Sequence, residues 1–181
     1  MKKIFQMSAK TFYGFEDILC EELKKINAID IIKSNRIVHF KGDKELMYKA
    51  NLCLRTALKI LLPLKNKKVL NYEALYKFAF DFEWEHYLQK DSSFYINSVC
   101  FGKDFTHSLY VSQRVKDGIV DRFRKLKGSR PTVDKLKPDI YIDVHIDKKL
   151  CTFSLNSSGR NLNQRGYRKK SNEAPLNEVL A

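Results

Sequence analysis

Residues 139–155, DIYIDVHIDKKLCTFSL, carry the clearest structural signal in the chain. Apolar side chains alternate with other side chains over residues 139–146, which predicts a strand with one buried and one solvent-facing side. The expected buried positions are Ile140, Ile142, Val144 and Ile146, and the expected solvent-facing positions are Tyr141, Asp143 and His145. Residues 147–149 turn the chain back into a second alternating strand over 151–155, so the stretch predicts a β-hairpin.

The residues before this hairpin predict three helices and one strand. The longest helix covers 107–127, and its expected apolar stripe consists of Val111, Val115, Ile119, Phe123 and Leu126. Gly128 and Pro131 end this helix, because glycine allows the reversed backbone and proline cannot continue a helix. Upstream, residues 72–80 and 84–88 predict short helices and residues 94–101 predict a strand. The second half therefore has the order ααβαββ.

The first 64 residues predict a smaller domain of their own. We expect strands over 5–9, 29–33, 36–41 and 56–64, and helices over 14–28 and 43–50. Asp43 is expected to cap the second helix, whose buried residues would be Leu46, Met47 and Ala50. The order βαββαβ is that of the ferredoxin-like fold, which hosts many functions. With a polar connector at 65–72, the whole chain is predicted to belong to the α+β class.

The last stretch, residues 157–181, is basic and then amphipathic. Five cations and no acid fall within residues 160–170. Residues 172–181 predict the start of an amphipathic helix, which Asn172 can cap and whose first turn accommodates Pro175. Because no residues follow to cover its apolar face, we expect 159–181 to be a linker and the beginning of a further domain.

Composition favours a folded protein of the cytoplasm. Hydrophobic residues make up 44% of the chain, and the longest apolar run, residues 60–62, is far too short to cross a membrane. The four cysteines are widely spaced, which favours reduced, buried thiols over disulfides or zinc ligands. The histidines are equally scattered, and we expect no metal site. The cysteines are Cys20, Cys53, Cys100 and Cys151.

The net charge of +13 is concentrated in the second half of the chain, where residues 103–137 hold ten cations and four acids. Such a surplus suits a polyanionic partner, although a lysine-rich solvated surface would have the same composition. Asp117 and Asp121 are also spaced to pair with arginines of the 107–127 helix. The candidate phosphate contacts in this region are Arg114, Arg124, Lys125, Lys127, Arg130, Lys135 and Lys137.

The second basic cluster adds further candidates for phosphate binding. Guanidinium groups suit bidentate contacts with phosphate, and an interleaved tyrosine could stack on an unpaired base. An architectural role is the alternative, and we favour it for Gly166 and Tyr167 as parts of an interdomain joint. The remaining RNA-binding candidates are Arg160, Arg165, Arg168, Lys169 and Lys170.

No motif for catalysis is present in these 181 residues. None of the seven glycines forms Gly-x-Gly, so there is no nucleoside-cradling loop. No two prolines are adjacent, so the Asn-Pro-Pro-Tyr motif of amino-group methylases is missing as well. We expect no catalytic residue and no cofactor site within this stretch.

Two segments resemble the junction found in bacterial THUMP-containing ribosomal-RNA methyltransferases. They are Ser158–Arg168, SGRNLNQRGYR, and Ala174–Ala181, APLNEVLA. The family usually has histidine where this chain has Asn163. The stretches Gly14-Phe15-Glu16, Asn51-Leu52-Cys53-Leu54-Arg55 and Arg130-Pro131 also fit the family pattern. The resemblance implies a ferredoxin-like domain at 1–64, a THUMP domain at 65–158, and a linker with the start of a methyltransferase domain at 159–181.

The same resemblance implies a function. The chain would be the RNA-binding portion of an S-adenosylmethionine-dependent 23S rRNA (guanine-N(2)-) methyltransferase, partnered by its own C-terminal catalytic domain. S-adenosylmethionine would then bind to the full-length protein and not to this portion. Two alternatives stay open: a THUMP module of a tRNA-modifying enzyme, and a free-standing, non-enzymatic RNA-binding adaptor. The Arg-Gly-Tyr-Arg and Ala-Pro-Leu segments favour the methyltransferase.

Overall fold

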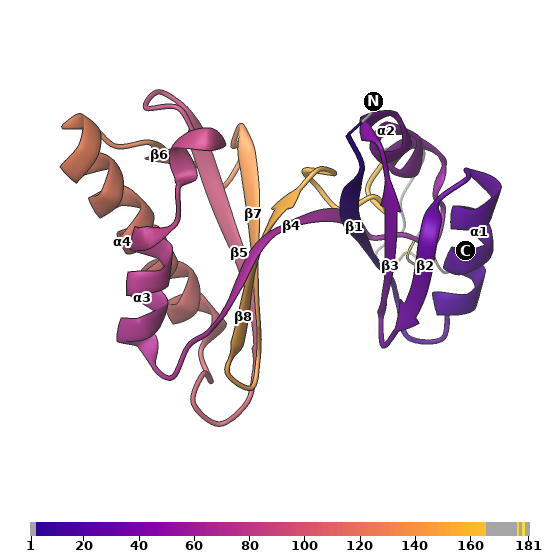
Figure 1. Ribbon diagram of the computed structural model, residues 1–181, viewed down its shortest axis with the longest axis horizontal. Coiled ribbons are helices and arrows are strands. Elements are labelled where there is room, and N and C mark those ends of the chain that lie inside the picture. Colours follow the sequence, from indigo (N-terminus) through magenta and orange to yellow (C-terminus); the bar gives the residue numbers. More distant parts are fainter. Residues whose placement is uncertain (1–2, 166–176, 178, 180–181) are drawn as a thin grey trace. The chain divides into compact units, whose positions relative to one another are not determined.

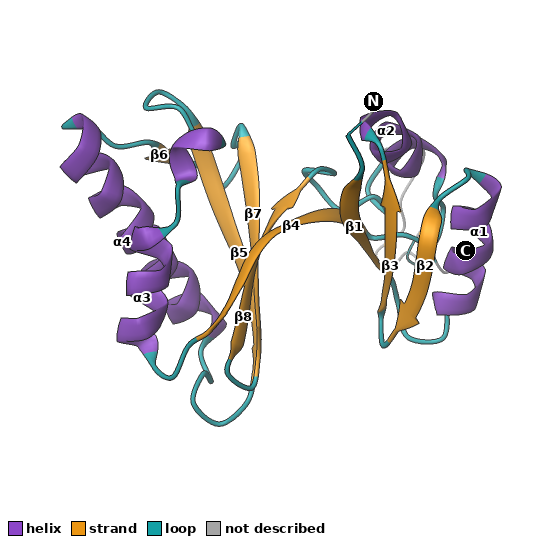
Figure 2. Ribbon diagram, viewed as in Figure 1, coloured by secondary structure: helices purple, strands orange, loops and turns teal. Residues whose placement is uncertain are grey.

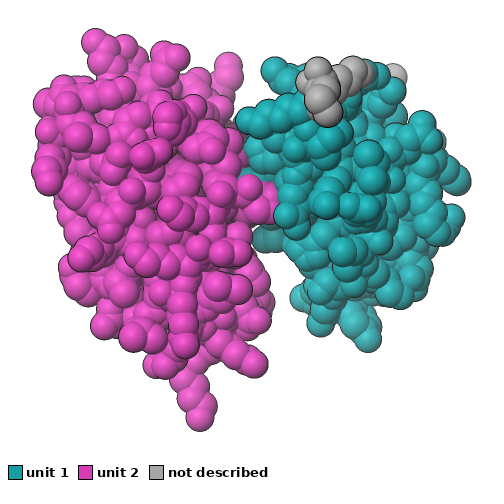
Figure 3. Space-filling model, in the orientation of Figure 1, with its two compact units in different colours: residues 1–62, 156–181 teal, residues 63–155 magenta. Residues whose placement is uncertain are grey.

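The computed structural model describes residues 3–165 together with Asn177 and Val179. The chain divides into two compact units (Figure 3). Unit 1 comprises residues 1–62 and 156–181, and unit 2 comprises residues 63–155. Among the described residues, no helix is both long enough and apolar enough to cross a lipid bilayer.

Unit 1 is built on antiparallel strands (Figures 1 and 2). Strand β1 lies in the middle, pairing with β3 on one side and with β4 on the other, while β2 pairs with β3. The strand order β2-β3-β1-β4 and the chain order βαββαβ confirm the predicted ferredoxin-like fold. Its elements are β1 (Phe5–Lys10), α1 (Glu16–Lys25), β2 (Ile29–Ser34), β3 (Ile37–Gly42), α2 (Lys44–Cys53) and β4 (Lys59–Lys68), which continues into unit 2.

Helices α1 and α2 share one core with β1 and β3. Side chains two positions apart on a strand lie on the same face, and this face packs on both helices. Asp43 caps α2 as predicted, since its carboxylate accepts the Leu46 N–H at 2.8 Å. Ile18 also lies on α1, but it is 51% exposed and does not belong to this core. The fully or nearly fully buried residues include Met7, Ala9, Leu19, Leu23, Val38, Phe40, Leu46 and Ala50.

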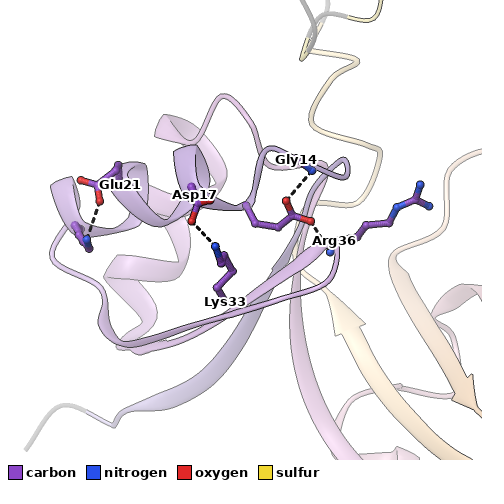
Figure 4. Close-up of polar contacts among 7 residues, drawn as sticks. Gly14, Asp17, Glu21, Lys33 and Arg36 are labelled. Carbon is purple, nitrogen blue, oxygen red and sulfur yellow. Dashed lines mark hydrogen bonds and ion pairs between the residues drawn. The ribbon is translucent and has the colours of Figure 1, made fainter.

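A carboxylate holds the start of α1 in place (Figure 4). Glu16 accepts the backbone N–H of Gly14 at 2.7 Å and that of Arg36 at 2.9 Å. Gly14 has φ +86°, a conformation that favours glycine, so the turn before the helix needs this residue. The hydrogen bond from Arg36 is the main cause that lowers the pKa of Glu16 below its ordinary value.

Unit 2 has a sheet of order β4-β8-β7-β5-β6. Strand β5 runs parallel to β7, from the Phe94–Ile140 pair to the Phe101–Asp147 pair, and parallel to β6 over its first residues. The N-terminal ends of these three strands therefore share one edge of the sheet, and the C-terminal ends of β5 and β7 share the opposite edge. The strands are β5 (Ser93–Phe101), β6 (Thr132–Val133), β7 (Ile140–Asp147) and β8 (Leu150–Asn156).

Helices α3 (Tyr72–Asp81) and α4 (Ser108–Lys127) lie together on one face of this sheet (Figure 1). Gly118 allows their close contact, because a Cβ there would lie only 2.8 Å from the Cβ of Ala79. The predicted stripe of α4 is buried except for Leu126, which is 56% exposed. The core of unit 2 includes Phe78, Trp84, Phe94, Val111, Val115, Ile119, Phe123, Ile142, Val144 and Phe153.

Three elements of unit 2 differ from their predictions. Strand β4 continues to Lys68 and pairs with β8, so the first half of the predicted polar connector at 65–72 is a strand. The predicted helix at 84–88 is one 3₁₀ turn, η1 (Trp84–His86). Strand β6 was not predicted, because two residues are too short to show any periodicity.

Two further side-chain predictions were wrong. Asp143 was expected to face solvent, but it is buried and accepts a hydrogen bond at 2.9 Å from Nδ2 of Asn97, its register partner on β5. Cys53 was expected to be buried, but it is exposed at the end of α2. All four cysteines are free thiols, and burial raises the pKa of Cys151 to about 12.

Candidate nucleic-acid interface

Arg114, a candidate phosphate contact on α4, binds helix α3. Its Nη2 lies 2.9 Å from Oε2 of Glu73, and its guanidinium lies 4.8 Å from the ring centroid of Tyr76. The side chain is only 22% exposed. The neighbour that sequence spacing suggested, Asp117, instead pairs with Lys116 at 2.7 Å. Arg114 therefore holds the two helices together, and little of its guanidinium is available to a ligand.

Arg122 likewise links α4 to other elements of unit 2, namely η1 and the end of α3. Its Nε donates to Oε1 of Glu85 at 2.7 Å, and its Nη1 donates to the carbonyl of Phe80 at 3.0 Å. Burial alone would raise the pKa of Glu85, but the bond from its own backbone N–H and the Arg122 pair lower it below the ordinary value. This pair is largely buried, so it serves the packing of unit 2.

Arg124 forms a weaker, exposed pair on the outer face of α4. Its Nη1 lies 3.2 Å from Oδ1 of Asp121, and both side chains are open to solvent. Exposed pairs of this kind contribute roughly 0.3–0.5 kcal/mol, because water screens the charges. Arg124 can therefore leave Asp121 for a phosphate at small cost.

Five candidate cations are exposed and pair with no carboxylate within residues 3–165. The Nζ of Lys125 lies 5.5 Å from the ring centroid of Phe80, and the Nζ of Lys127 lies 5.5 Å from that of Phe123. Both lysines thus pass over aromatic rings while their side chains stay open to solvent. We call this set the basic end; its members are Lys125, Lys127, Arg130, Lys135 and Lys137.

Three members of the basic end come from the loop that links α4 to β7, residues 128–139. The loop begins at Gly128, whose φ of +63° ends the helix and whose N–H bonds to the carbonyl of Arg124. Its middle is fastened to β5 through β6, with the Asp134 N–H donating to the carbonyl of Phe94 at 3.1 Å. The loop is therefore fixed against the N-terminal end of β5.

Two aspartates of this loop bind backbone groups. Oδ1 of Asp134 accepts the N–H of Leu136 at 2.8 Å and that of Lys137 at 3.2 Å. Oδ2 of Asp139 accepts the N–H and the hydroxyl of Ser93, both at 2.8 Å, and these bonds lower the pKa of Asp139. Both carboxylates thus fix the shape of the loop and leave Lys135 unpaired.

Lys90 is a neighbouring cation that the sequence did not single out. It is exposed in the turn before β5, two residues from Ser92, whose carbonyl accepts the Thr132 N–H at 3.1 Å. The turn and the loop therefore meet at the same edge of the sheet. Charge counting could not find Lys90, because residues 61–102 hold equal numbers of cations and acids.

The junction after β8 is bound to unit 1. The N–H and the hydroxyl of Ser157 donate to the carbonyl of Ile60 at 2.9 and 3.0 Å, and Oγ of Ser158 accepts the Ile60 N–H at 2.8 Å. Ser158 also donates to Oδ1 of Asn51 at 2.7 Å, and Leu162 packs against the core of unit 1. The first part of the predicted linker is therefore a fixed part of unit 1.

Arg165, a candidate phosphate contact, is the last described residue of this junction, and its guanidinium donates hydrogen bonds to three backbone carbonyls. Its Nη1 donates to Leu52 at 2.8 Å, its Nη2 to Leu54 at 2.7 Å and its Nε to Leu162 at 3.0 Å. Leu52 and Leu54 lie at the C-terminal end of α2, where helix carbonyls lack intrahelical partners and carry partial negative charge. The guanidinium thus binds the end of a helix in this structure.

The other candidates of the second cluster are placed differently. Arg160 is exposed in unit 1, where it has an interaction partner. Gly166, Tyr167, Arg168, Lys169 and Lys170 lie outside the described residues, as does almost all of the helix predicted at 172–181. An open groove of about 620 Å³ lies beside Arg165 in unit 1. Its described lining consists of Leu52, Cys53, Leu54, Arg55, Leu162, Asn163, Arg165 and Val179.

Three solved structures that are similar to this chain are named as methylases or methyltransferases. A predicted N6-adenine-specific DNA methylase from Listeria monocytogenes is 27% identical, with a TM-score of 0.82 over 98% of this chain and 47% of that one. A possible methylase from Clostridium difficile is 26% identical, with a TM-score of 0.84 over 98% of this chain and 47% of that one.

SMU.472, named as a methyltransferase and complexed with SAH, is also 26% identical, with a TM-score of 0.81 over 99% of this chain and 48% of that one. This chain thus spans about half the length of the solved structures that it matches.

Two domain families match the chain in adjacent stretches. The RlmL ferredoxin-like domain matches residues 6–61, and the THUMP domain matches residues 70–156. The first match lies within unit 1 and the second covers nearly all of unit 2. The chain therefore contains a THUMP domain preceded by a ferredoxin-like domain of the RlmL type, which is the domain order of the N-terminal region of a THUMP-containing rRNA methyltransferase.

Proposed function

We propose that this chain is the RNA-capturing portion of an S-adenosylmethionine-dependent 23S rRNA (guanine-N(2)-) methyltransferase, and that the basic end of unit 2 binds the RNA backbone. One observation carries the proposal: a loop fixed by its own aspartates presents exposed cations that pair with no carboxylate within residues 3–165. Ordered cations cost less entropy to place on a ligand than mobile ones.

The chemistry of the basic end suits phosphate. Arg130 offers a planar fork that matches two phosphate oxygens, and the lysines supply point charges around it. No base-reading constellation is needed, because structured RNA is recognised largely through its backbone and shape. Arg124, in the last turn of α4, and Lys90, in the turn before β5, are further candidates for phosphate contacts.

We assign the methyl-transfer chemistry to a C-terminal domain outside these 181 residues. S-adenosylmethionine would supply the methyl group there, in line with the SAH held by one similar protein. The present residues do not fit this cofactor. The sequence has no Gly-x-Gly loop, and the described lining of the groove in unit 1 has no carboxylate to bind ribose hydroxyls.

Salt dependence of RNA binding tests the proposal. If the basic end neutralises about four phosphates, log affinity for a 23S rRNA fragment should fall against log salt with a slope of roughly −3 to −4. Replacing Lys127, Arg130, Lys135 and Lys137 with Glu should flatten the slope and weaken binding roughly a hundredfold at 0.1 M salt. Fluorescence anisotropy on the 181-residue chain measures both quantities.

The matched control makes the same change of charge in unit 1. Lys24, Lys33, Lys41 and Lys49 are exposed and each pairs with a carboxylate. Replacing these four with Glu should leave the affinity within about threefold and the slope nearly unchanged. Equal losses in both variants, or tighter binding to duplex DNA than to rRNA, would contradict the proposed site.

A further inference from the structure

The C-terminal edge of the unit 2 sheet exposes an aromatic ring among lysines. Phe101, the last residue of β5, is 57% exposed, whereas the other phenylalanines and the tryptophan of this unit are buried or half-buried. Three segments meet there, residues 68–70, 101–104 and 147–150, and we call them the Phe101 platform. They contain four lysines and two aspartates, so the platform has a surplus of positive charge.

Backbone contacts hold the platform in one shape. The Lys148 N–H donates to the carbonyl of Phe101 at 2.7 Å, and the Val69 N–H donates to the carbonyl of Lys149 at 2.8 Å. Gly102 permits this approach, because a Cβ there would lie 3.1 Å from Cα of Lys148 and its φ is +133°. The ring thus stands on a rigid base, with His145 at its edge at a centroid distance of 5.9 Å.

The charges around the ring are available to a ligand. Lys68, Lys103 and Lys148 are exposed, and none of them pairs with a carboxylate in the described part of the chain. Lys149 lies 3.7 Å from Asp104, and Asp147 is the register partner of Phe101. A ring among exposed lysines from three segments offers a stacking surface together with phosphate contacts, which is how proteins hold unpaired nucleotides.

We propose that the Phe101 platform binds an unpaired nucleotide of RNA, with the base stacked on Phe101 and the flanking phosphates held by Lys103 and Lys148. This inference rests on the proposed capture of RNA and adds a second, separate contact to it. The nine residues of β5 place the platform roughly 26 Å from the basic end. The two sites would therefore bind a paired segment and a single-stranded segment of one RNA.

Substitutions at Phe101 distinguish base stacking from apolar burial. The probes are an RNA stem with a single-stranded 3′ overhang carrying 2-aminopurine, and the same stem with a blunt end. Phe101→Ala and Phe101→Leu should each weaken binding of the overhang RNA about tenfold, because a stacked base is lost in both. Phe101→Trp should retain the affinity, and the stem without overhang should bind all variants equally.

Fluorescence of 2-aminopurine gives a direct readout of stacking. It should be quenched by the wild-type chain and by Phe101→Trp, but not by the Ala or Leu variants. Leu109→Ala is the matched control, since Leu109 is an exposed apolar residue of α4 outside the platform. It should change neither affinity nor fluorescence.

Other outcomes would overturn the inference. Wild-type affinity in Phe101→Ala, or full rescue by Leu, would show that no base stacks on this ring. Loss of binding to phosphatidylserine vesicles in Phe101→Ala with unchanged RNA affinity would assign the platform to a membrane surface. The double variant Lys103→Glu/Lys148→Glu provides an independent test and should also weaken only the overhang RNA. If the basic-end variants bound the blunt stem as tightly as the wild type, the proposed capture of RNA by the basic end would be contradicted. That result is independent of the overhang measurements, so the two proposals are tested separately.

Discussion

The guanidinium groups of Arg114, Arg122 and Arg165 bind groups of the protein itself, whereas Arg130 is exposed without a carboxylate partner in the described residues. Local spacing along α4 pointed to Asp117 as a partner of Arg114, but the actual partner is on another helix. A count of cations cannot show such pairs, because their partners are distant in sequence. The sequence therefore shows which residues are basic, but only the fold shows which of their charged groups are available to bind a phosphate.

The contribution of the Glu16 carboxylate to stability can be tested by measuring stability at different pH values. Its pKa is lowered in the folded protein, chiefly by the hydrogen bond from Arg36, so its carboxylate stabilises the fold above the ordinary pKa of glutamate. This stabilisation is lost as pH falls through the lowered pKa. We expect Glu16→Gln to lower the melting temperature at pH 7 and to lose less stability than wild type below about pH 4.5. Circular dichroism melts between pH 7 and pH 3 measure both effects.

Glu21→Gln is the control for this test, since Glu21 forms only an exposed pair with Lys24 on the same helix. Its melting temperature and its pH dependence should match those of the wild type, because exposed pairs contribute little. Identical acid sensitivity in Glu16→Gln and in wild type would show that Glu16 does not carry the effect.

At the scale of elements, periodicity predicted nearly every helix and strand, and the misses have physical causes. Residues 65–68 of β4 look like a connector because they are three lysines and one asparagine, yet the strand that they extend pairs with β8. Strand β6 has no periodic signal and exists because the loop at 128–139 lies against β5. Asp143 is buried and bonds to Asn97 of the neighbouring strand β5, a contact that alternation alone does not reveal.

Asp134 tests whether the shape of that loop matters for RNA binding. Asp134→Ala removes the acceptor of the Leu136 and Lys137 N–H groups and should loosen the loop. The substitution also removes a negative charge, which by electrostatics alone would strengthen binding to RNA. We expect the loss of order to prevail, so that affinity for the rRNA fragment falls about threefold or more. Fluorescence anisotropy measures the change.

Asp134→Asn separates the two effects, because asparagine keeps an acceptor oxygen while losing the charge. This variant should bind RNA as tightly as the wild type or slightly more tightly. If Asp134→Ala also gained affinity, charge would be the dominant factor and the fixed loop would not be needed for binding.

On the scale of the whole molecule, the residues after β8 belong to unit 1, the same unit as the first 62 residues of the chain. Ser157, Ser158 and Arg165 bind β4 and the end of α2, about 100 residues earlier in the chain. The THUMP domain is thus inserted between two parts of unit 1. The family resemblance predicts a junction in this stretch of sequence, and the fold shows that residues 157–165 are bound to unit 1.

This arrangement predicts that Arg165→Ala lowers the free energy of unfolding of unit 1 and leaves that of unit 2 unchanged. The variant leaves the carbonyls of Leu52 and Leu54 without their donor, which should cost unit 1 about 1–2 kcal/mol and about 4 °C or more of melting temperature. Trp84 is the only tryptophan and is buried in unit 2, so its fluorescence reports that unit alone. Its transition should stay unchanged, while circular dichroism shows the lower transition of unit 1.

Arg165→Lys is the matched variant, since it keeps the charge but a single ammonium cannot reproduce the planar fork that spans three carbonyls. It should fall between wild type and Arg165→Ala. If the Trp84 transition moved by the same amount as the circular dichroism transition, the two units would unfold together. Arg165 would then stabilise the whole chain, and the junction would couple the THUMP domain to unit 1 instead of belonging to unit 1 alone.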